Sequence, residues 1–263
     1  MRIILTIFLL GILYNSHAQI FPPVNDSVIY YSDFAFKCTF TKEDQVNVTA
    51  LSKLPSNTIP LLATIDDVMY KSNENGLYFG QEVTLLYNKT LTIPPMNSSW
   101  VVFAEVYVLG ENAALIVKGM TGGARPPFSS STELNLHKKT LELKNRLKNA
   151  DLVLFGKVSG VVNKNESVVS EHAPKIKMAS IRVNSNSILR SSQQIQIGTW
   201  ITVEFPTSND GMWADKPDEL QTGNEYILIL NYNRNPNIYF LPDKKNVIDK
   251  RRLNKIKLLI STL

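Results

Sequence analysis

Cysteine and histidine are scarce in this 263-residue chain, which has one cysteine, Cys38, and three histidines. A single cysteine forms no intramolecular disulfide and cannot supply the thiolates of a structural zinc site. His17 falls within the N-terminal leader described below, and the remaining two, His137 and His172, are too few for a three-histidine zinc centre. We therefore expect no metal and no cofactor.

Common catalytic motifs are missing too. The chain has no H-E-x-x-H, G-x-S-x-G, P-loop or G-x-G-x-x-G motif. Asp66 and Asp67 are adjacent on a predicted strand, so their carboxylates point to opposite faces and do not converge as a glycosidase pair. No nucleic-acid-binding motif is present. The sequence thus predicts a protein that is not an enzyme and does not bind nucleic acid.

A long hydrophobic run occurs only at the N-terminus. Met1 and Arg2 are followed by a 12-residue apolar run and then by the small residues Ser16 and Ala18. This pattern predicts a secretory signal over residues 1–18, cleaved before Gln19; a buried N-terminal strand or helix is the alternative. Because no later run reaches the ~18 apolar residues of a membrane helix, we expect an exported protein, secreted or periplasmic, that is not integral to a membrane.

The rest of the chain has the composition of a folded protein, with 44% hydrophobic and 19% charged residues. Most of it is predicted to form short strands. Phe34, Phe36, Cys38 and Phe40 alternate with smaller or polar residues, which places Cys38 on the apolar face of a strand. We expect a buried, inert thiol there; a reactive thiol is the alternative.

The expected strands fall into two groups. Those of the first half are Asp33 to Phe40, Val46 to Leu51, Leu61 to Tyr70, Glu82 to Tyr87, Trp100 to Leu109 and Ala113 to Lys118. Those of the second half are Asp151 to Val161, Lys175 to Val183, Ile195 to Phe205, Glu225 to Leu230 and Ile238 to Leu241. A shift of apolar parity within Lys175 to Val183 predicts a β-bulge that would help a barrel to close.

A linker rich in glycine, proline and serine separates the two groups, followed by a helix. Ser130 and Glu133 have capping-box spacing. The helix has an apolar stripe of Leu134, Leu141, Leu143 and Leu147, with Lys138, Lys139, Lys144, Arg146 and Lys148 expected largely on the opposite side. A second helix is predicted from about Ile248 to the C-terminus.

The two groups share local features in the same order. Asp33, the segment Leu62 to Ile65 and Gly80 in the first half correspond to Asp151, the segment Met178 to Ile181 and Gly198 in the second. We interpret this as a tandem duplication of a ~90-residue β module; the alternative is that any two β modules share alternation and turn glycines.

These observations predict an all-β protein with minor helices, built of two tandem OB-like or β-barrel modules joined by a linker and a helix. The expected boundaries are a signal peptide at 1–18, a first β module at 19–120, a linker and helix at 121–149, and a second β module with a C-terminal helix at 150–263.

The second half resembles a family of uncharacterised exported bacterial proteins. The resemblance rests on Ala150 to Val158, Ser170 to Pro174, Phe205 to Trp213 and Gly223 to Leu230. Where Ala173 stands here, that family has an aspartate. The strand order of this half also resembles the OB-type barrel of tissue inhibitors of metalloproteinases and netrin-like modules. Those inhibitors chelate the protease zinc with an N-terminal cysteine, and Cys38 is internal, so only the fold is implied.

One polar cluster is the candidate binding site. Two predicted loops of the second module carry its members, which are Ser170, Glu171, His172, Asp210 and Trp213. If the loops meet at one end of the barrel, His172 and Asp210 would orient a ligand and Trp213 would stack on a ring. The alternative is structural, because Asn209-Asp210-Gly211 is turn chemistry. A hydrolase that uses His172 and Asp210 is a further hypothesis.

Basic residues gather near the C-terminus. Between Asp243 and Lys257 the chain has seven, namely Lys244, Lys245, Lys250, Arg251, Arg252, Lys255 and Lys257. They would contact an anionic surface or an acidic partner; a solvated helix face is the alternative. We expect an exported, non-enzymatic binding protein that contacts a protein or an anionic cell-envelope component. The alternative functions are an extracellular peptidase inhibitor and the hydrolase.

Overall fold

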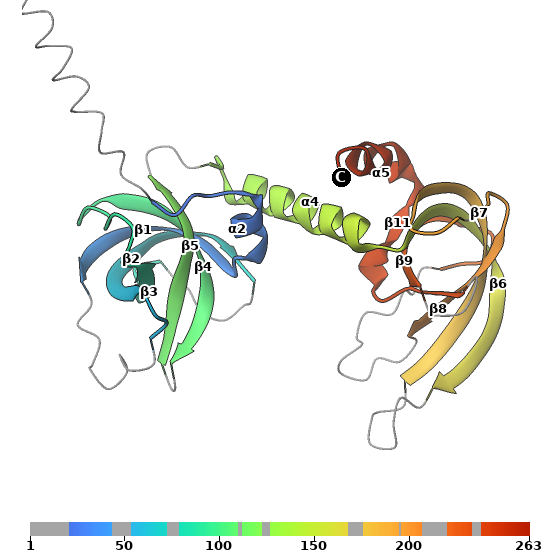
Figure 1. Cartoon of the computed structure of the whole chain (residues 1–263), viewed down its shortest axis with the longest axis horizontal. Helices are drawn as coiled ribbons and strands as arrows, with labels where there is room; N and C mark the ends of the chain where they lie inside the picture. Colours follow the sequence, from blue (N-terminus) through green and yellow to red (C-terminus); the bar gives the residue numbers. More distant parts are fainter. Residues whose placement is uncertain are drawn as a thin grey trace, which may run out of the picture. The chain divides into compact units, whose positions relative to one another are not determined.

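The computed structural model describes residues 21–43, 54–72, 79–109, 112–122, 127–167, 176–194, 196–206, 220–232 and 238–263. The chain divides into two compact units, Met1–Leu141 and Glu142–Leu263. Both are built mainly of β-strands, with a few short helices (Figure 1). Of the helices in the described part of the chain, none combines the length and apolar character that a membrane crossing needs.

The first unit contains a closed five-stranded barrel. Its elements are α2 (Asp26–Tyr31), β1 (Phe34–Glu43), β2 (Thr58–Lys71), β3 (Glu82–Asn88), β4 (Ser99–Leu109) and β5 (Asn112–Gly122). The strand order is β1-β2-β3-β5-β4, and β4 pairs back with β1 to close the barrel. Among these five described strands, β3 and β5 pair in parallel and the other pairings are antiparallel. Five strands in this order are consistent with an OB-type barrel.

Helix α2 was not expected from the sequence. Its signal is local: the Asn25 side chain accepts a hydrogen bond from the Val28 amide at 3.0 Å and so caps the helix. A six-residue helix carries too little periodicity to stand out from the surrounding polar residues.

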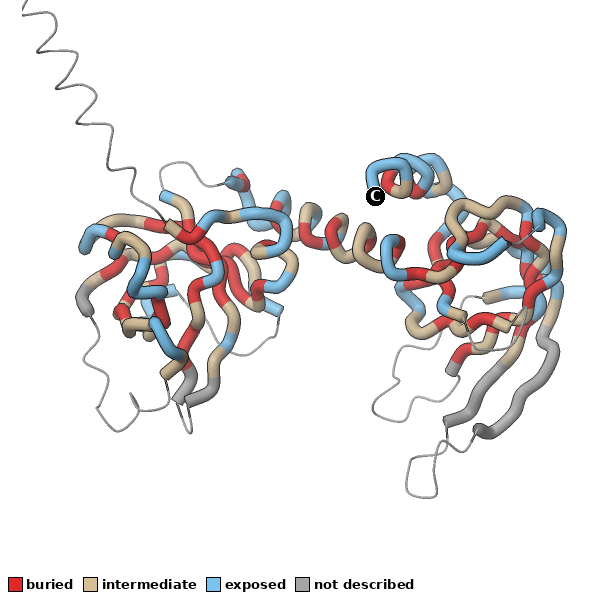
Figure 2. The backbone as a smooth tube through the Cα atoms, viewed as in Figure 1, coloured by how far each residue is buried: buried red, intermediate tan, exposed pale blue. Residues whose placement is uncertain are grey.

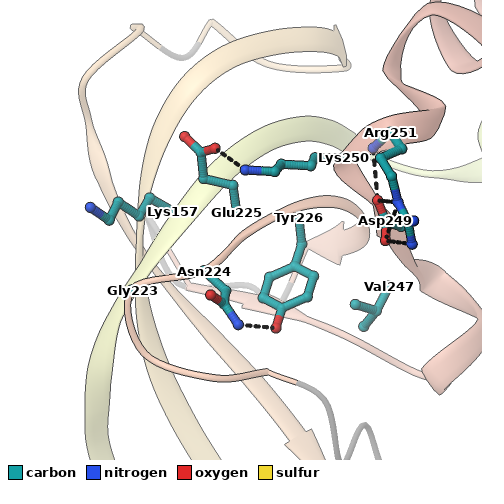
Figure 3. A pocket seen from close by; sticks show the side chains of 9 residues that line it. All are labelled: Lys157, Gly223, Asn224, Glu225, Tyr226, Val247, Asp249, Lys250 and Arg251. Carbon is teal, nitrogen blue, oxygen red and sulfur yellow. Dashed lines mark hydrogen bonds and ion pairs between the residues drawn. The ribbon is translucent and has the colours of Figure 1, made fainter.

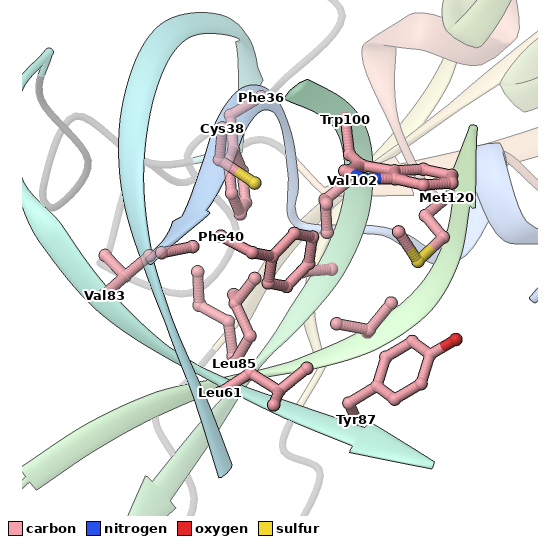
Figure 4. Close-up of a cluster of buried hydrophobic side chains, with 14 of the residues drawn as sticks. Phe36, Cys38, Phe40, Leu61, Val83, Leu85, Tyr87, Trp100, Val102 and Met120 are labelled. Atoms are coloured by element: carbon pink, nitrogen blue, oxygen red, sulfur yellow. The ribbon is translucent and has the colours of Figure 1, made fainter. Parts of the chain in front are cut away.

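The interior of the first barrel follows the predicted alternation along β1. Phe36, Cys38 and Phe40 have no exposed surface and point inward with Leu61 and Leu85 (Figure 4). Burial, together with the charge of Asp66, raises the pKa of the Cys38 thiol to about 12. The prediction of a buried Cys38 is therefore confirmed.

The burial of Cys38 has a chemical consequence. We expect the native protein to leave a thiol reagent such as Ellman's reagent unreacted at pH 8, because the thiol is both inaccessible and protonated there. The same reagent should titrate one thiol after denaturation in guanidinium. Fast labelling of the native chain would contradict the burial of β1.

Helix α4 (Ser131–Asn149) confirms the predicted helix and its cap. Ser130 Oγ accepts a hydrogen bond from the Glu133 amide at 3.2 Å. The Glu133 carboxylate accepts hydrogen bonds from the Ser129 hydroxyl at 2.6 Å and from the Ser129 amide at 2.7 Å, one residue earlier than in a standard capping box. These two bonds from Ser129 lower the pKa of Glu133. The apolar stripe divides between the two units, with Leu134 and Leu141 in a core cluster of the first and Leu143 and Leu147 in one of the second.

The expectation that Lys138 lies on the solvated side of α4 was wrong. Lys138 is 6% exposed. Its ammonium group donates a hydrogen bond to the Ser32 carbonyl and lies 3.8 Å from the centroid of the Tyr70 ring. A long stem and two such partners allow a lysine to be buried on a helix face that the charge pattern alone would expose.

The second unit contains a barrel with the same strand order. Its elements are β6 (Leu152–Ser167), β7 (Ile176–Ser191), β8 (Trp200–Pro206), β9 (Glu225–Tyr232), β10 (Ile238–Phe240), η1 (Lys244–Asn246), β11 (Val247–Asp249), η2 (Lys250–Arg252) and α5 (Leu253–Ile260). Strand β10 pairs parallel with β8 and antiparallel with β9, which closes the barrel. Strand β11 adds to the free edge of β9. Buried hydrophobic residues form a core cluster in each barrel, and Figure 2 marks buried residues in red along the strands of both.

The predicted start of the C-terminal helix was wrong. Ile248 lies in β11 and pairs with Ile227, and α5 begins only at Leu253. Ile248 stands at helical spacing from Ile256 and Leu259 in the sequence, which made it look like part of the same helix. It packs in the same core cluster as these two residues, but from a strand.

The bulge predicted within Lys175 to Val183 was wrong for the described stretch Ile176 to Val183, which has no extra residue; β7 has its extra residues further along, at Asn186 and Leu189. The register between β6 and β7 shifts between Val158 and Gly160 and again between Val161 and Asn163, where β6 has the extra residues. The stretch of β7 opposite them, Ser180 to Val183, pairs without an insertion. The apolar residues of β7 therefore change from even to odd positions opposite the bulges of β6 rather than at a bulge of their own.

Matching hydrogen bonds relate the two barrels residue by residue. The Asp33 carboxylate accepts from the Val106 amide at 3.1 Å, and the Asp151 carboxylate accepts from the Tyr232 amide at 2.7 Å. The carbonyl of each aspartate also accepts from the end of the following hairpin, from Ser72 in one barrel and Ser192 in the other, at 2.8 Å in both. The predicted correspondence of Asp33 with Asp151 agrees with these bonds.

The turn glycines correspond as well, but the strand before them does not match as predicted. Gly80 and Gly198 have φ values of 76° and 83°, and their amides donate to the carbonyls of Ile65 and Ser185, both at 2.8 Å. Ile65 is therefore equivalent to Ser185, four residues beyond the predicted Ile181. The predicted alignment was wrong because the similar tetrapeptides Leu62 to Ile65 and Met178 to Ile181 lie at different positions along β2 and β7.

Candidate functional site

The five residues predicted to form a binding site lie outside the described residues. Ser170, Glu171 and His172 belong to segment 168–175, and Asp210 and Trp213 belong to segment 207–219. The strands that precede these segments, β6 and β8, both pair antiparallel with β7 and therefore run in the same direction. That the two segments meet at one site stays a prediction.

A pocket of about 550 Å³ lies at the start of β9, where the described chain resumes after segment 207–219. Its wall includes the turn at Gly223 and Asn224, and its other sides come from β6, β11 and η2 (Figure 3). Gly223 has a φ of 89°, and its amide donates to the Val158 carbonyl at 2.8 Å. This bond fixes the turn against β6 and so holds one wall of the pocket.

One side of the pocket is aromatic and apolar. The Tyr226 ring lies between Asn224 and Val247, and both Tyr226 and Val247 are partly buried against the barrel core (Figure 3). The Tyr226 hydroxyl accepts hydrogen bonds from the Asn224 side-chain amide at 3.4 Å and from the Gln221 backbone amide at 3.3 Å. The ring is thus held in one place.

The rim of the pocket is charged, with a small positive excess. The Lys250 ammonium lies 3.2 Å from the Glu225 carboxylate. The Arg251 guanidinium lies 2.8 Å from Asp249, and its hydrogen bonds lower the pKa of that carboxyl to about 2. Lys157 adds an exposed ammonium group from β6. Three basic and two acidic side chains therefore line the pocket.

The basic segment predicted near the C-terminus lies beside this pocket in the chain. All seven of its basic side chains are exposed, and they lie on η1, η2 and α5. Within the part of the chain that the structure describes, Lys250 and Arg251 have acidic partners, and none is found for Arg252, Lys255 and Lys257. The segment therefore presents a net positive surface next to the pocket rim.

A second hollow, of about 710 Å³, lies in the first unit between α2 and the β3–β5 junction. Its lining is mixed polar and apolar and includes an ion pair at 2.8 Å between Lys118 and Glu105. Over the described ranges, no group of three or more histidine, cysteine, aspartate or glutamate side chains could hold a metal ion.

Comparison with known proteins leaves the function open. No family model and no curated protein sequence matches the chain. Two solved structures are similar over 80% of this chain and 89% of theirs, each with a TM-score of 0.19. One is described as "Structural mimicry for functional antagonism" (12% identity) and the other as "Molecular basis for abrogation of activation of pro-inflammatory cytokines" (11% identity). Scores this low support no argument about fold or function.

Of the residues that line this pocket, sequence reasoning singled out only Lys250 and Arg251, as members of the basic segment. Asn224 stood within a segment used for the family resemblance, Tyr226 lay in the predicted strand Glu225 to Leu230, and Val247 directly preceded the predicted C-terminal helix. The available signal was the internal repeat, because Tyr226 follows a turn residue just as Trp100 does in the first half.

Proposed function

We propose that this protein is an exported, non-enzymatic binding protein whose second barrel recruits an acidic partner outside the cytoplasm. The observation that carries the proposal is the exposed basic segment of η1, η2 and α5 beside a preformed pocket. Export is supported by the N-terminal pattern of residues 1–18, and a net charge of +4 remains after Arg2 is removed with them.

Several features favour binding over catalysis. The described pocket has an aromatic side and a charged rim whose acidic groups are paired with cations, an arrangement suited to holding a ligand. Positive groups that lack acidic neighbours attract an oppositely charged surface over about a Debye length and raise the rate of encounter. Arg252, Lys255 and Lys257, for which no acidic partner is found among the described residues, are such groups.

Removing two of these charges tests the proposal. The double substitution K255Q/K257Q should weaken binding of the exported chain to poly-L-glutamate several-fold at low salt and flatten the dependence of affinity on salt concentration. Both side chains are exposed on α5, so the fold should persist. Isothermal titration at several salt concentrations makes the measurement.

The matched control is K89Q/K139Q, which removes the same charge from exposed positions of the first unit. Equal losses in the two double variants would mean that only net charge matters and would count against a binding face on the second barrel. Binding to alginate but not to poly-L-glutamate would mean that the partner is an acidic polysaccharide.

A further inference from the structure

The two barrels carry an aromatic residue at equivalent positions. Trp100 is the second residue of β4 and Tyr226 the second residue of β9. Each has its polar tip hydrogen-bonded to the side chain two residues earlier, Trp100 Nε1 to Ser98 Oγ at 2.6 Å and the Tyr226 hydroxyl to Asn224 Nδ2 at 3.4 Å.

The residues before these aromatics correspond too. Asn97 and Gly223 both have positive φ, 59° and 89°. Their amides donate to the carbonyls of Phe40 and Val158, at 2.7 and 2.8 Å. Both aromatics therefore follow the same turn, docked at the same point of the first strand of the barrel.

The neighbouring strand completes the correspondence. Met120 in β5 pairs with Val102, and Val247 in β11 pairs with Leu228. Val102 and Leu228 each come two residues after the aromatic, so Met120 and Val247 are equivalent. We call the space beside Trp100 and Met120 the mouth of the first barrel (Figure 4), and the space beside Tyr226 and Val247 the mouth of the second (Figure 3).

The first mouth is filled by the chain itself. The Phe21 ring lies 4.5 Å from the Trp100 ring between centroids, and Trp100 is only 9% exposed. The next residue anchors the segment, because the Pro22 carbonyl accepts a hydrogen bond from the Met120 amide at 2.9 Å. An extended N-terminal segment thus places an aromatic ring at the end of its own barrel.

The second mouth is the 550 Å³ pocket. The Val247 amide, equivalent to that of Met120, donates to the Lys244 carbonyl within the chain. A segment entering this mouth would therefore gain its affinity from a side chain rather than from that backbone bond. The rim has three basic side chains against the two acidic ones of Glu225 and Asp249, and the exposed basic segment of η1, η2 and α5 adds to this positive excess, which favours acidic residues beside the entering ring.

We infer that the mouth of the second barrel receives an aromatic side chain of an acidic partner polypeptide, in the place equivalent to that of Phe21 in the first barrel. The inference rests on the proposed function and names its partner class and contact. Tyr226 and Val247 supply the apolar contacts for the ring. Asn224 contributes a polar side chain to the lining of the same pocket.

The probe is a fluorescein-labelled peptide of residues 19–25 of this chain, which contains Phe21. We expect it to bind the exported chain saturably in a polarisation assay. Replacing its phenylalanine by alanine should weaken binding about ten- to hundredfold, since a buried phenyl ring is lost. The variant V247W fills the mouth and should abolish binding, whereas V106W, at an exposed valine of β4, should not.

Other results would overturn the inference. These are absence of saturable binding, equal binding of the alanine peptide, or unchanged binding to V247W. A higher affinity of the W213A variant for the peptide would mean that this chain's own Trp213 competes for the mouth. That result would also contradict the inference that the mouth receives a side chain of a partner. The variant K255Q/K257Q separates the two proposals: it should weaken poly-L-glutamate binding while the preference of the peptide site for phenylalanine over alanine persists.

Discussion

Replacing Gly156 by alanine is expected to destabilise the second barrel by about 3 kcal/mol. An added Cβ would lie 2.7 Å from the Asn184 carbonyl oxygen and at the same distance from Leu154 Cδ1 and Val183 Cγ1. The oxygen belongs to the paired strand β7 and cannot move without breaking the ladder, so β6 and β7 must separate locally. Gly156 is therefore required by space rather than by backbone conformation.

Hydrogen exchange in increasing denaturant would measure this loss, because it follows each barrel separately. Peptides from β6 and β7 should lose protection at lower denaturant in G156A, while those from β1 to β5 stay unchanged. The control is G122A, at a glycine of β5 where an added Cβ meets nothing within 4 Å. A G156A protein as stable as G122A would mean that the packing of β6 on β7 is described wrongly.

The substitution D151A should destabilise the second barrel by about 2 kcal/mol, because it leaves the partly buried Tyr232 amide without its charged acceptor. The bond is 2.7 Å long and joins the start of β6 to the end of β9, so it closes the barrel seam. D151N keeps an oxygen acceptor and should recover part of the loss.

The equivalent substitution in the first barrel should cost less. The Asp33 carboxylate accepts from the Val106 amide at 3.1 Å in an exposed setting, where water can replace it. Urea unfolding of D33A and D151A, followed barrel by barrel, makes the comparison. A larger loss of unfolding free energy in D33A than in D151A would contradict the assignment of the Asp33 bond as exposed and the Asp151 bond as partly buried.

Alternation in the sequence was sufficient to predict the two-barrel fold. Phe36, Cys38 and Phe40 form one inner face because strand geometry sends alternate side chains to the same side. The paired aspartates Asp33 and Asp151 were recognisable because each stands directly before an apolar strand. Both patterns involve residues that are close together in the chain, so they can be read from one sequence.

Other features depend on contacts between distant segments and could not be predicted in this way. The burial of Lys138 depends on Tyr70 and Ser32, more than sixty residues earlier in the chain. Ile248 and Asp249 lie in β11 rather than in the expected helix because β11 pairs with the edge of β9. The pocket beside Tyr226 became visible only when the equivalent site in the first barrel was seen to be filled.

The central claim is that Phe21 occupies in the first barrel the place that stays open in the second. The variant F21A, titrated with the phenylalanine peptide of residues 19–25, tests it most directly. Two sites per chain are predicted for F21A and one for the unaltered chain, since removal of the ring opens the first mouth beside Trp100. A single site in both proteins, with unchanged affinity, would contradict the claim that the two mouths are equivalent.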